Sequence, residues 1–366
     1  MIKMVNKKKG FLDDKRILIT GGTGSWGNEL TTQILSKFNP QEIIIYSRGE
    51  IKQVEMKRRF NNKKLNFVIG DVRNKERLMA ITKDIDVIFH LAALKHVPVC
   101  EENAYESLTI NILGTENIIE CAIQNNVKKV VYVSTDKAVS PINIYGVAKA
   151  ASERLIVNAN MKNTNTVFAC IRAGNVLGSS GSVIPLFKKQ IEISNIVTIT
   201  DKQMTRFIMS LGQAVTLLLK ATEMSIGGEI FVTKMPGIKI TNLAKVMIQR
   251  IGNRSTKIEY IGIRPGEKLH EVLVSEYECS RTVEFGNYYI ILPYVPIEKA
   301  FKKYEKLNKV GFKDYTSENT NILNDSDILD VLLSNNFLES KVFDPVTDML
   351  NKESIKRLSN KEKWLI

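Results

Sequence analysis

Short apolar runs alternate with longer helical patterns over the first half of the chain. The runs are continuous and rich in β-branched residues, as expected of strands that are buried on both faces. Buried strands separated by helices are typical of a parallel sheet covered by helices on both sides. The pattern therefore predicts a doubly wound α/β fold. The predicted strands lie at residues 17–19, 43–46, 65–69, 87–89, 130–133 and 167–171.

The regular alternation fades after Gly174, and a smaller α/β unit is predicted beyond it. Helical patterns occur at 212–224 and 242–251, and a segment at 317–333 reads as a loop that ends in a helix. Asp325 or Ser326 is the expected N-cap of that last helix. Strand-like segments lie at 229–232 and 288–292, and a flexible loop is expected at 178–182. The expected division is a basic tail at 1–14, a doubly wound domain at 15–174, an interleaved second domain and cap at 175–336, and an extension at 337–366.

Length and charge suit this two-domain picture. The chain has 366 residues, more than one ordinary domain needs. Its net charge of +13 invites a nucleic-acid-binding interpretation. However, four lysines within 1–9 and an excess of three basic residues within 351–366 account for +7 of that charge. Solvated ends explain most of the surplus, so nucleic-acid binding is the weakest of the hypotheses.

Other classes of protein are disfavoured by what the sequence lacks. Four widely spaced cysteines and three histidines make a disulfide framework or a metal site unexpected. The basic N-terminus is followed by neither an apolar signal region nor a cleavage site, and no apolar run is long enough to cross a membrane. We therefore expect a cytoplasmic protein with no metal and no membrane contact.

A glycine-rich turn at 20–27 joins the first predicted strand to a helical pattern. Gly22, Gly24 and Gly27 satisfy G-x-G-x-x-G, and Gly21 begins a second, overlapping spacing. Glycines let backbone amides approach a pyrophosphate, and the helix N-terminus favours its charge. The strand–turn–helix context therefore predicts a Rossmann-like dinucleotide site. The contacts expected from this turn come from Gly21, Thr23, Gly24, Ser25, Trp26 and Gly27.

The end of the second strand bears on which dinucleotide binds. An NAD site typically offers an acidic residue there, whereas this strand ends in Ser47 and Arg48, a hydroxyl and a guanidinium suited to a 2′-phosphate. We expect NADP, although Glu50 nearby leaves NAD open. The other expected cofactor-binding residues are Asp71, Val72, Ala92, Ala93, Lys95 and Asn111, with Tyr145 and Lys149 at the reactive end.

A tyrosine and a lysine follow the fifth predicted strand at helical spacing. The strand ends at Ser134 and Thr135, and Tyr145 and Lys149, four residues apart, share one helix face. A cation beside a phenol lowers the pKa of the phenol, which can then take a proton from an alcohol while hydride leaves the same carbon. This spacing alone usually marks a solvated face. After a dinucleotide turn it predicts a dehydrogenase-like site.

Together these motifs resemble the extended short-chain dehydrogenase/reductases that act on nucleotide sugars. Within that superfamily the chain resembles the inverting UDP-N-acetylglucosamine 4,6-dehydratases of pseudaminic-acid, flagellar-glycan and capsule pathways. The similarity covers residues 15–293, with a weaker echo at 315–333. The segments that carry it are 93–98, 134–138, 172–176, 182–185, 204–207 and 264–268.

The resemblance implies a role for each protic side chain. Tyr145 is the base at C4, Lys149 lowers its pKa and binds ribose, and Thr135 bonds the C4 oxygen. Asp136 is the acid at C6 and Lys137 the base at C5, where related dehydratases without this lysine use an Asp–Glu pair. A local ion pair is the plainer interpretation of Asp136 and Lys137. As a base Lys137 must be partly neutral, which burial and a nearby Lys149 are expected to favour.

The resemblance also implies a UDP-sugar substrate, a tightly bound and recycled cofactor and a homo-oligomer. Three alternatives stay open: a retaining 4,6-dehydratase, a nucleotide-sugar 4-epimerase, and a catalytically silent NAD(P) sensor. The epimerase needs Tyr145 and Lys149 but has no use for Asp136 and Lys137, and an intact Tyr–Lys pair counts against the sensor. The expected substrate-binding residues are Lys95, His96, Asn175, Val183, Arg206, Arg264 and Glu267.

Overall fold

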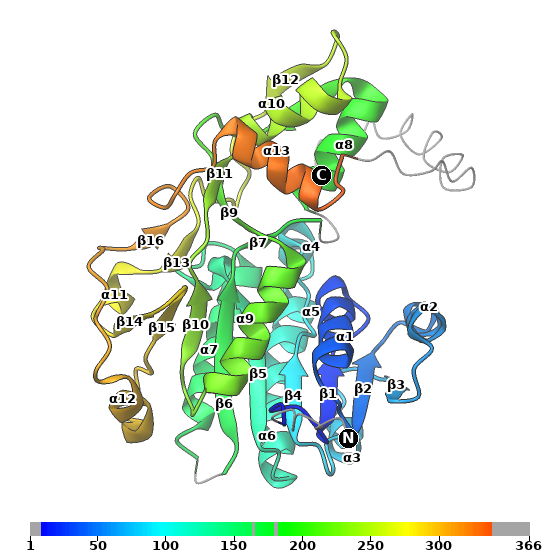
Figure 1. Ribbon diagram of the computed structural model, residues 1–366, viewed down its shortest axis with the longest axis vertical. Helices are drawn as coiled ribbons and strands as arrows, with labels where there is room; N and C mark the ends of the chain where they lie inside the picture. Colours follow the sequence, from blue (N-terminus) through cyan, green and yellow to red (C-terminus); the bar gives the residue numbers. More distant parts are fainter. Residues whose placement is uncertain (1–8, 163–164, 179–181, 339–366) are drawn as a thin grey trace, which may run out of the picture.

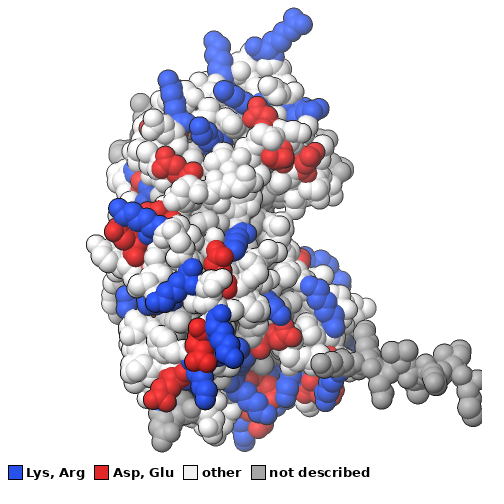
Figure 2. Space-filling view, turned by 60° about the vertical axis from the view of Figure 1, so that its left-hand side comes forward, with Lys and Arg blue, Asp and Glu red and all other residues white. Residues whose placement is uncertain are grey.

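The computed structural model describes residues 9–162, 165–178 and 182–338. Most of the expected basic tail and of the C-terminal extension lies outside these residues, as does the centre of the expected loop at 178–182. Figure 1 shows a large part built around one sheet and a smaller part above the ends of its strands. In Figure 2 the outline is hollowed between the two parts, and acidic and basic side chains are interspersed over the face shown.

One nine-stranded sheet organises the larger part. Its first six strands are parallel, in the order β3-β2-β1-β4-β5-β6. The order reverses between β1 and β4, which opens a crevice at the carboxyl ends of those strands. This arrangement confirms the predicted doubly wound, Rossmann-like fold. The strands are β1 (Arg16–Thr20), β2 (Glu42–Ser47), β3 (Leu65–Ile69), β4 (Val87–His90), β5 (Lys129–Thr135) and β6 (Val167–Ala173).

Helices cover both faces of the sheet, as the buried strands require. Alternate residues of β1 point to opposite faces: Ile17 and Ile19 join one apolar core, and Leu18 joins the other. The core on the Ile17 side is closed by α1 (Ser25–Lys37), α2 (Glu50–Phe60) and α9 (Leu211–Met224). The opposite core is closed by α3 (Lys75–Ile81), α6 (Gly114–Gln124) and α7 (Ile144–Ala159).

The sheet is completed by strands from beyond residue 174, which is how the two parts interleave. β10 (Ile230–Thr233) pairs parallel with β6, and β15 (Tyr288–Ile291) and β14 (Thr282–Phe285) follow in antiparallel register. Short elements connect these strands to the rest of the molecule. They are α4 (Val97–Glu102), α5 (Ala104–Leu108), the π-helix η1 (Thr109–Leu113), the 3₁₀ turn η2 (Asp136–Ala138), α11 (Glu276–Cys279) and α12 (Glu298–Tyr304).

The smaller part has an apolar core of its own, in which Phe187, Val197, Met247 and Leu332 are fully buried. Its last helix begins one residue earlier than expected, because Asn324 is the N-cap and accepts a hydrogen bond from the Asp327 amide at 3.0 Å. None of the helices in the described ranges is long and apolar enough to cross a membrane. Its elements are β7 (Asn175–Val176), α8 (Val183–Ser194), β8 (Ile196–Ile199), β9 (Thr205–Met209), β11 (Gly237–Lys239), α10 (Ile240–Ile251), β12 (Lys257–Tyr260), β13 (Val272–Val274), β16 (Tyr315–Thr316) and α13 (Asp325–Ser334).

Candidate active site

The glycine-rich turn forms a cradle at the crevice between β1 and β4. Gly21 has φ +66°, and a side chain there would place its Cβ 2.8 Å from the Ala92 amide nitrogen in the loop after β4. A Cβ on Gly27 would collide with the carbonyl of Gly22, so helix α1 can pack this closely against the turn only with glycine at position 27. The N-cap of α1 is Gly24, so no side chain makes a capping hydrogen bond. The first turn of α1 contains no acidic residue. The exposed amides and the helix dipole suit a pyrophosphate, so this turn fits a dinucleotide.

Hydroxyl and basic groups lie beside the cradle. Thr23 Oγ1 donates to Ser47 Oγ at 3.1 Å, which joins the turn to the end of β2. The Arg48 guanidinium is more than half exposed and lies 4.0 Å from Asp71 Oδ2. Burial opposes ionisation of Asp71, but hydrogen bonds from Arg73 and the charge of both arginines hold its pKa below the usual range. A cavity of about 520 Å³ opens at the turn, lined by Thr23, Gly24, Ser25, Asn28, Lys52 and Arg59 among others.

Two residues expected to touch the cofactor have other partners in the structure. Val72 is buried and packs against Gly114 in the apolar core. The Asn111 side chain accepts from the Leu94 amide at 2.8 Å and donates to the Leu94 carbonyl at 3.0 Å. Both therefore support the walls of the crevice, and Asn111 fixes the loop that carries Ala92 and Ala93.

Tyr145 and Lys149 lie on the buried face of α7, beneath the carboxyl end of β5. Tyr145 is 8% exposed and Lys149 is 4% exposed. Burial raises the pKa of Tyr145 to about 12, and the charge of Lys137 acts against this rise. Lys149 Nζ donates to the Val133 carbonyl at 2.6 Å and lies 4.0 Å from the centre of the Tyr132 ring. Lys137 is therefore one cation that favours the phenolate in this structure, in addition to the role expected of Lys149.

Asp136 is the most deeply buried acid of the site. It is 1% exposed, and its Oδ1 accepts from Thr135 Oγ1 at 2.7 Å and from Lys137 Nζ at 3.2 Å. Its Oδ2 is buried and has no hydrogen-bond partner among the residues that the structure describes. Burial and the negative charge of Glu271 raise the pKa of Asp136. A carboxyl group that keeps its proton is suited to act as a general acid.

Glu271, which the sequence analysis did not single out, completes the centre of the site. Its Oε1 lies 3.2 Å from Lys137 Nζ and 3.7 Å from Arg206 Nε. Burial favours neutral Lys137, but Asp136 and Glu271 outweigh it and raise the pKa of the lysine. The expectation that burial leaves Lys137 partly neutral was therefore wrong in direction. The sequence held one signal for Glu271, its place shortly after the motif at 264–268.

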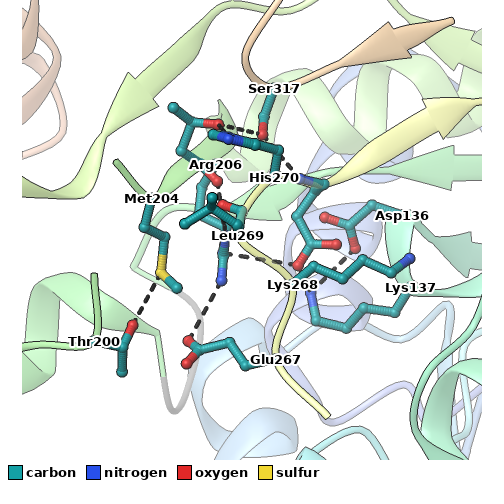
Figure 3. Close-up of polar contacts among 12 residues, drawn as sticks. Asp136, Lys137, Thr200, Met204, Arg206, Glu267, Lys268, Leu269, His270 and Ser317 are labelled. Carbon is teal, nitrogen blue, oxygen red and sulfur yellow. Dashed lines mark hydrogen bonds and ion pairs between the residues drawn. The ribbon is translucent and has the colours of Figure 1, made fainter. Parts of the chain in front are cut away.

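Two of the expected substrate residues, Arg206 and Glu267, lie near this centre. Figure 3 shows Arg206, Glu267 and Lys268 beside Asp136 and Lys137. Arg206 donates to the backbone carbonyls of Thr205 and Leu269 and lies 3.4 Å from Glu267 Oε1. These contacts join β9 to the loop before β13 directly over the end of β5.

The remaining substrate candidates lie at the starts of β7 and α8 and in the loops before α4 and β13. Asn175 begins β7, and its Oδ1 is buried without a hydrogen-bond partner within the described ranges. Val183 begins α8, and the Arg264 carbonyl accepts from the Glu267 amide at 3.0 Å. Burial lowers the pKa of Lys95 and of His96, and Lys95 adds to the effect on His96. Within the described ranges no three His, Cys, Asp or Glu side chains are grouped to hold a metal ion.

The Rossmann-like sheet, the glycine turn and the Tyr–Lys pair define an extended short-chain dehydrogenase/reductase. The sequence model described as polysaccharide biosynthesis protein matches residues 17–293, and the chain belongs to that family. This finding and the relatives below confirm the resemblance seen in the sequence.

Two curated relatives align over most of the chain. A Campylobacter jejuni (strain 81-176) protein named UDP-N-acetylglucosamine 4,6-dehydratase (inverting) is 45% identical over 329 residues, 87% of this chain and 97% of the relative. A Rickettsia bellii (strain OSU 85-389) protein named UDP-glucose 4-epimerase is 44% identical over 340 residues, 90% of this chain and 98% of the relative. The X-ray structure of Pen from Bacillus thuringiensis has a TM-score of 0.84 at 38% identity and covers 90% of this chain and 100% of its own.

Proposed function

We propose that this protein is a UDP-N-acetylglucosamine 4,6-dehydratase that inverts the configuration at C5. It would make a UDP-2-acetamido-2,6-dideoxy-4-hexulose for polysaccharide or glycan synthesis. The observation that carries the proposal is the pair of buried Asp136 and partly buried Lys137 beside Tyr145, because an elimination needs an acid and a base in addition to an alcohol-oxidising tyrosine. The name of the Campylobacter relative supports the same substrate and outcome.

The glycine turn would hold a dinucleotide, and Ser47 and Arg48 favour NADP over NAD. When bound, this cofactor takes a hydride from C4 of the sugar and returns it to C6, so that it is recycled within one turnover. The backbone amides at the start of α1 would bind its pyrophosphate, and Asn111 keeps the facing loop in place.

Tyr145 would take the proton of the C4 hydroxyl while Thr135 bonds the same oxygen. Burial raises the pKa of Tyr145, so positive charge near the phenol favours the reaction. Lys137 supplies some of that charge in this structure. Lys149, held by the Val133 carbonyl, would bind the cofactor ribose.

Elimination would then use the adjacent pair. The ketone at C4 acidifies the C5 proton. The neutral form of Lys137, a minor form because its pKa is raised, removes that proton, while Asp136 gives its proton to the C6 hydroxyl and water leaves. The ammonium and carboxylate produced lie 3.2 Å apart, so the new charges are paired as they form. Arg206, Arg264 and Asn175 would bind the nucleotide end of the substrate from the smaller part, which we therefore assign as the substrate-binding domain and cap.

A 4-epimerase is the second candidate, because the Rickettsia relative carries that name. An epimerase uses Tyr145 and Lys149 in the same way but gives Asp136 and Lys137 no proton to transfer. The buried, unpaired Asp136 Oδ2 favours the dehydratase, since an unpaired buried oxygen is costly unless a substrate meets it. A cytoplasmic homo-oligomer stays part of the proposal.

The test is incubation with UDP-N-acetylglucosamine in deuterated water, followed by NMR of the product. We expect a 6-deoxy-4-keto sugar with deuterium at C5 and inverted configuration. Deuterium with retained configuration would make the enzyme a retaining dehydratase. A C4 epimer without solvent deuterium would replace the proposal with the epimerase.

A further inference from the structure

Glu271 has an environment that its role in the fold does not explain. It is 2% exposed, and its Oε1 lies 3.2 Å from Lys137 Nζ. Its Oε2 is buried and lacks a hydrogen-bond partner in the part of the chain that the structure describes. A buried carboxylate oxygen without a partner costs free energy, and groups of this kind concentrate at functional sites.

The backbone around Glu271 fixes the carboxylate in place. The Glu271 amide donates to Ser317 Oγ at 2.9 Å, and the Ser317 amide donates back to the Glu271 carbonyl at 2.8 Å. Ser317 is fully buried and its Oγ lies 2.7 Å from Thr205 Oγ1 on β9. Glu271 therefore reaches Lys137 from a hydrogen-bonded junction that joins the residue before β13 to Ser317 and β9.

We propose that Glu271 is a positioning residue that makes Lys137 a stronger base and keeps Asp136 protonated during the elimination. This inference rests on the proposed dehydratase function. The negative charge of Glu271 stabilises a proton on either neighbour, because both lie in a buried site where charges are poorly screened. When Lys137 takes the C5 proton, its new ammonium lies between two carboxylates, Asp136 and Glu271.

The other charged groups keep Glu271 ionised. Burial opposes its charge, but Lys137, Arg206 and Lys268 outweigh burial and lower the pKa of Glu271. Tyr145 is the remaining titratable group that faces the pair, and its pKa responds to Lys137 and Asp136. Glu271 thus supplies a constant negative charge while one proton moves from C5 to Lys137 and another moves from Asp136 to the C6 oxygen.

The test is the pH profile of deuterium incorporation at C5 for wild type, Glu271→Gln and Glu271→Asp. Glutamine keeps the shape and removes the charge. We expect both limbs of the profile to move to lower pH by about one pH unit, because loss of a neighbouring anion lowers the pKa of Asp136 and of Lys137 together. Glu271→Asp keeps the charge, so its limbs should stay at the wild-type pH although its rate falls.

Glu318→Gln is the matched control, because it removes a mostly exposed carboxylate of the same region that faces His270. Its limbs should not move. A Glu271→Gln profile with a lower rate but unmoved limbs would overturn the inference and leave Glu271 a purely structural residue. If Glu271→Gln does not fold, the test is the pH profile of Glu271→Asp. Movement of the limbs of that profile to lower pH would then overturn the inference. A wild-type enzyme that incorporates no deuterium would refute the proposed function, a result that is seen before any variant is compared.

Discussion

Two buried clusters of this protein each place a cation between two carboxylates, yet they differ in how completely their atoms are paired. In one, which we call the closed cluster, Arg172 lies between Glu153 and Glu278. In the other, the open cluster, Lys137 lies between Asp136 and Glu271. The closed cluster ties β6 to α7 and α11, and the open cluster lies where the two parts of the molecule meet.

Every N–H of the Arg172 side chain has a partner in the closed cluster. Arg172 bonds both oxygens of Glu153 and both of Glu278, and it also donates to the Leu273 carbonyl. Glu278 accepts further bonds from the amide and the hydroxyl of Ser275. Every polar side-chain atom of Arg172, Glu153 and Glu278 is therefore paired, and the cluster holds β6, α7 and α11 together.

The open cluster leaves one oxygen of each carboxylate unpaired among the described residues, Asp136 Oδ2 and Glu271 Oε2. Its cation is a lysine, which can lose a proton, whereas an arginine in a protein cannot. Buried carboxylates paired with a cation are therefore common to both clusters, and the unpaired oxygens and the lysine are the features expected of a reaction site.

The largest expected effect comes from Lys137→Met, which removes the amine and keeps the length of the side chain. The rate of product formation should fall by about 10²–10⁴-fold, the usual contribution of a general base. Cofactor binding, measured by fluorescence titration, should be unchanged. Lys220→Met, at a half-exposed position on α9, is the control and should keep the wild-type rate. Wild-type turnover by Lys137→Met would remove the lysine from the mechanism.

Arg172→Met should act on stability. It leaves Glu153 and Glu278 buried without their cation, so the free energy of unfolding should fall by about 3–5 kcal/mol. Urea denaturation followed by circular dichroism measures this loss. Lys137→Met should lose much less, because Asp136 can keep its proton and Arg206 and Lys268 still compensate the charge of Glu271. Equal losses in the two variants would contradict the distinction between the clusters.

The pH dependence of stability should have opposite signs in the two clusters. Burial opposes ionisation of Glu278, but Arg172 and Ser275 outweigh it and lower its pKa from 4.5 to about 2. A lowered carboxyl pKa contributes stability above the unfolded pKa, here up to about 3 kcal/mol, and the contribution is lost as the pH falls from 4.5 toward 2. The raised pKa of Asp136 has the reverse sign, because its contribution is lost as the pH rises.

Glu278→Gln should flatten the decrease in the free energy of unfolding between these two pH values, whereas Asp136→Asn should not flatten it, because the contribution of Asp136 has the opposite sign. Denaturant unfolding at a series of pH values measures both slopes. A Glu278→Gln slope as steep as that of wild type would place the acid sensitivity elsewhere.

The sequence predicted the doubly wound sheet because strands buried on both faces have a local signature, and the turn at 20–27 revealed the cofactor site for the same reason. Tyr145 and Lys149 are separated by one helical turn, so their shared face was also predictable. Glu271 was not, because only the packing of the smaller part over β5 brings it to Lys137. The protonation of Lys137 was predicted in the wrong direction because the charges of Asp136 and Glu271 were both missing from the argument.

The most direct measurement of the central claim is the mass of the product formed from UDP-N-acetylglucosamine by wild type and by Lys137→Met. The open cluster, as the proposed site of elimination, requires a wild-type product lighter than the substrate by one water, and about a hundredfold less of it, or lower, from the variant over the same time. A wild-type product with the mass of the substrate, or a dehydrated product from Lys137→Met at the wild-type rate, would contradict the account.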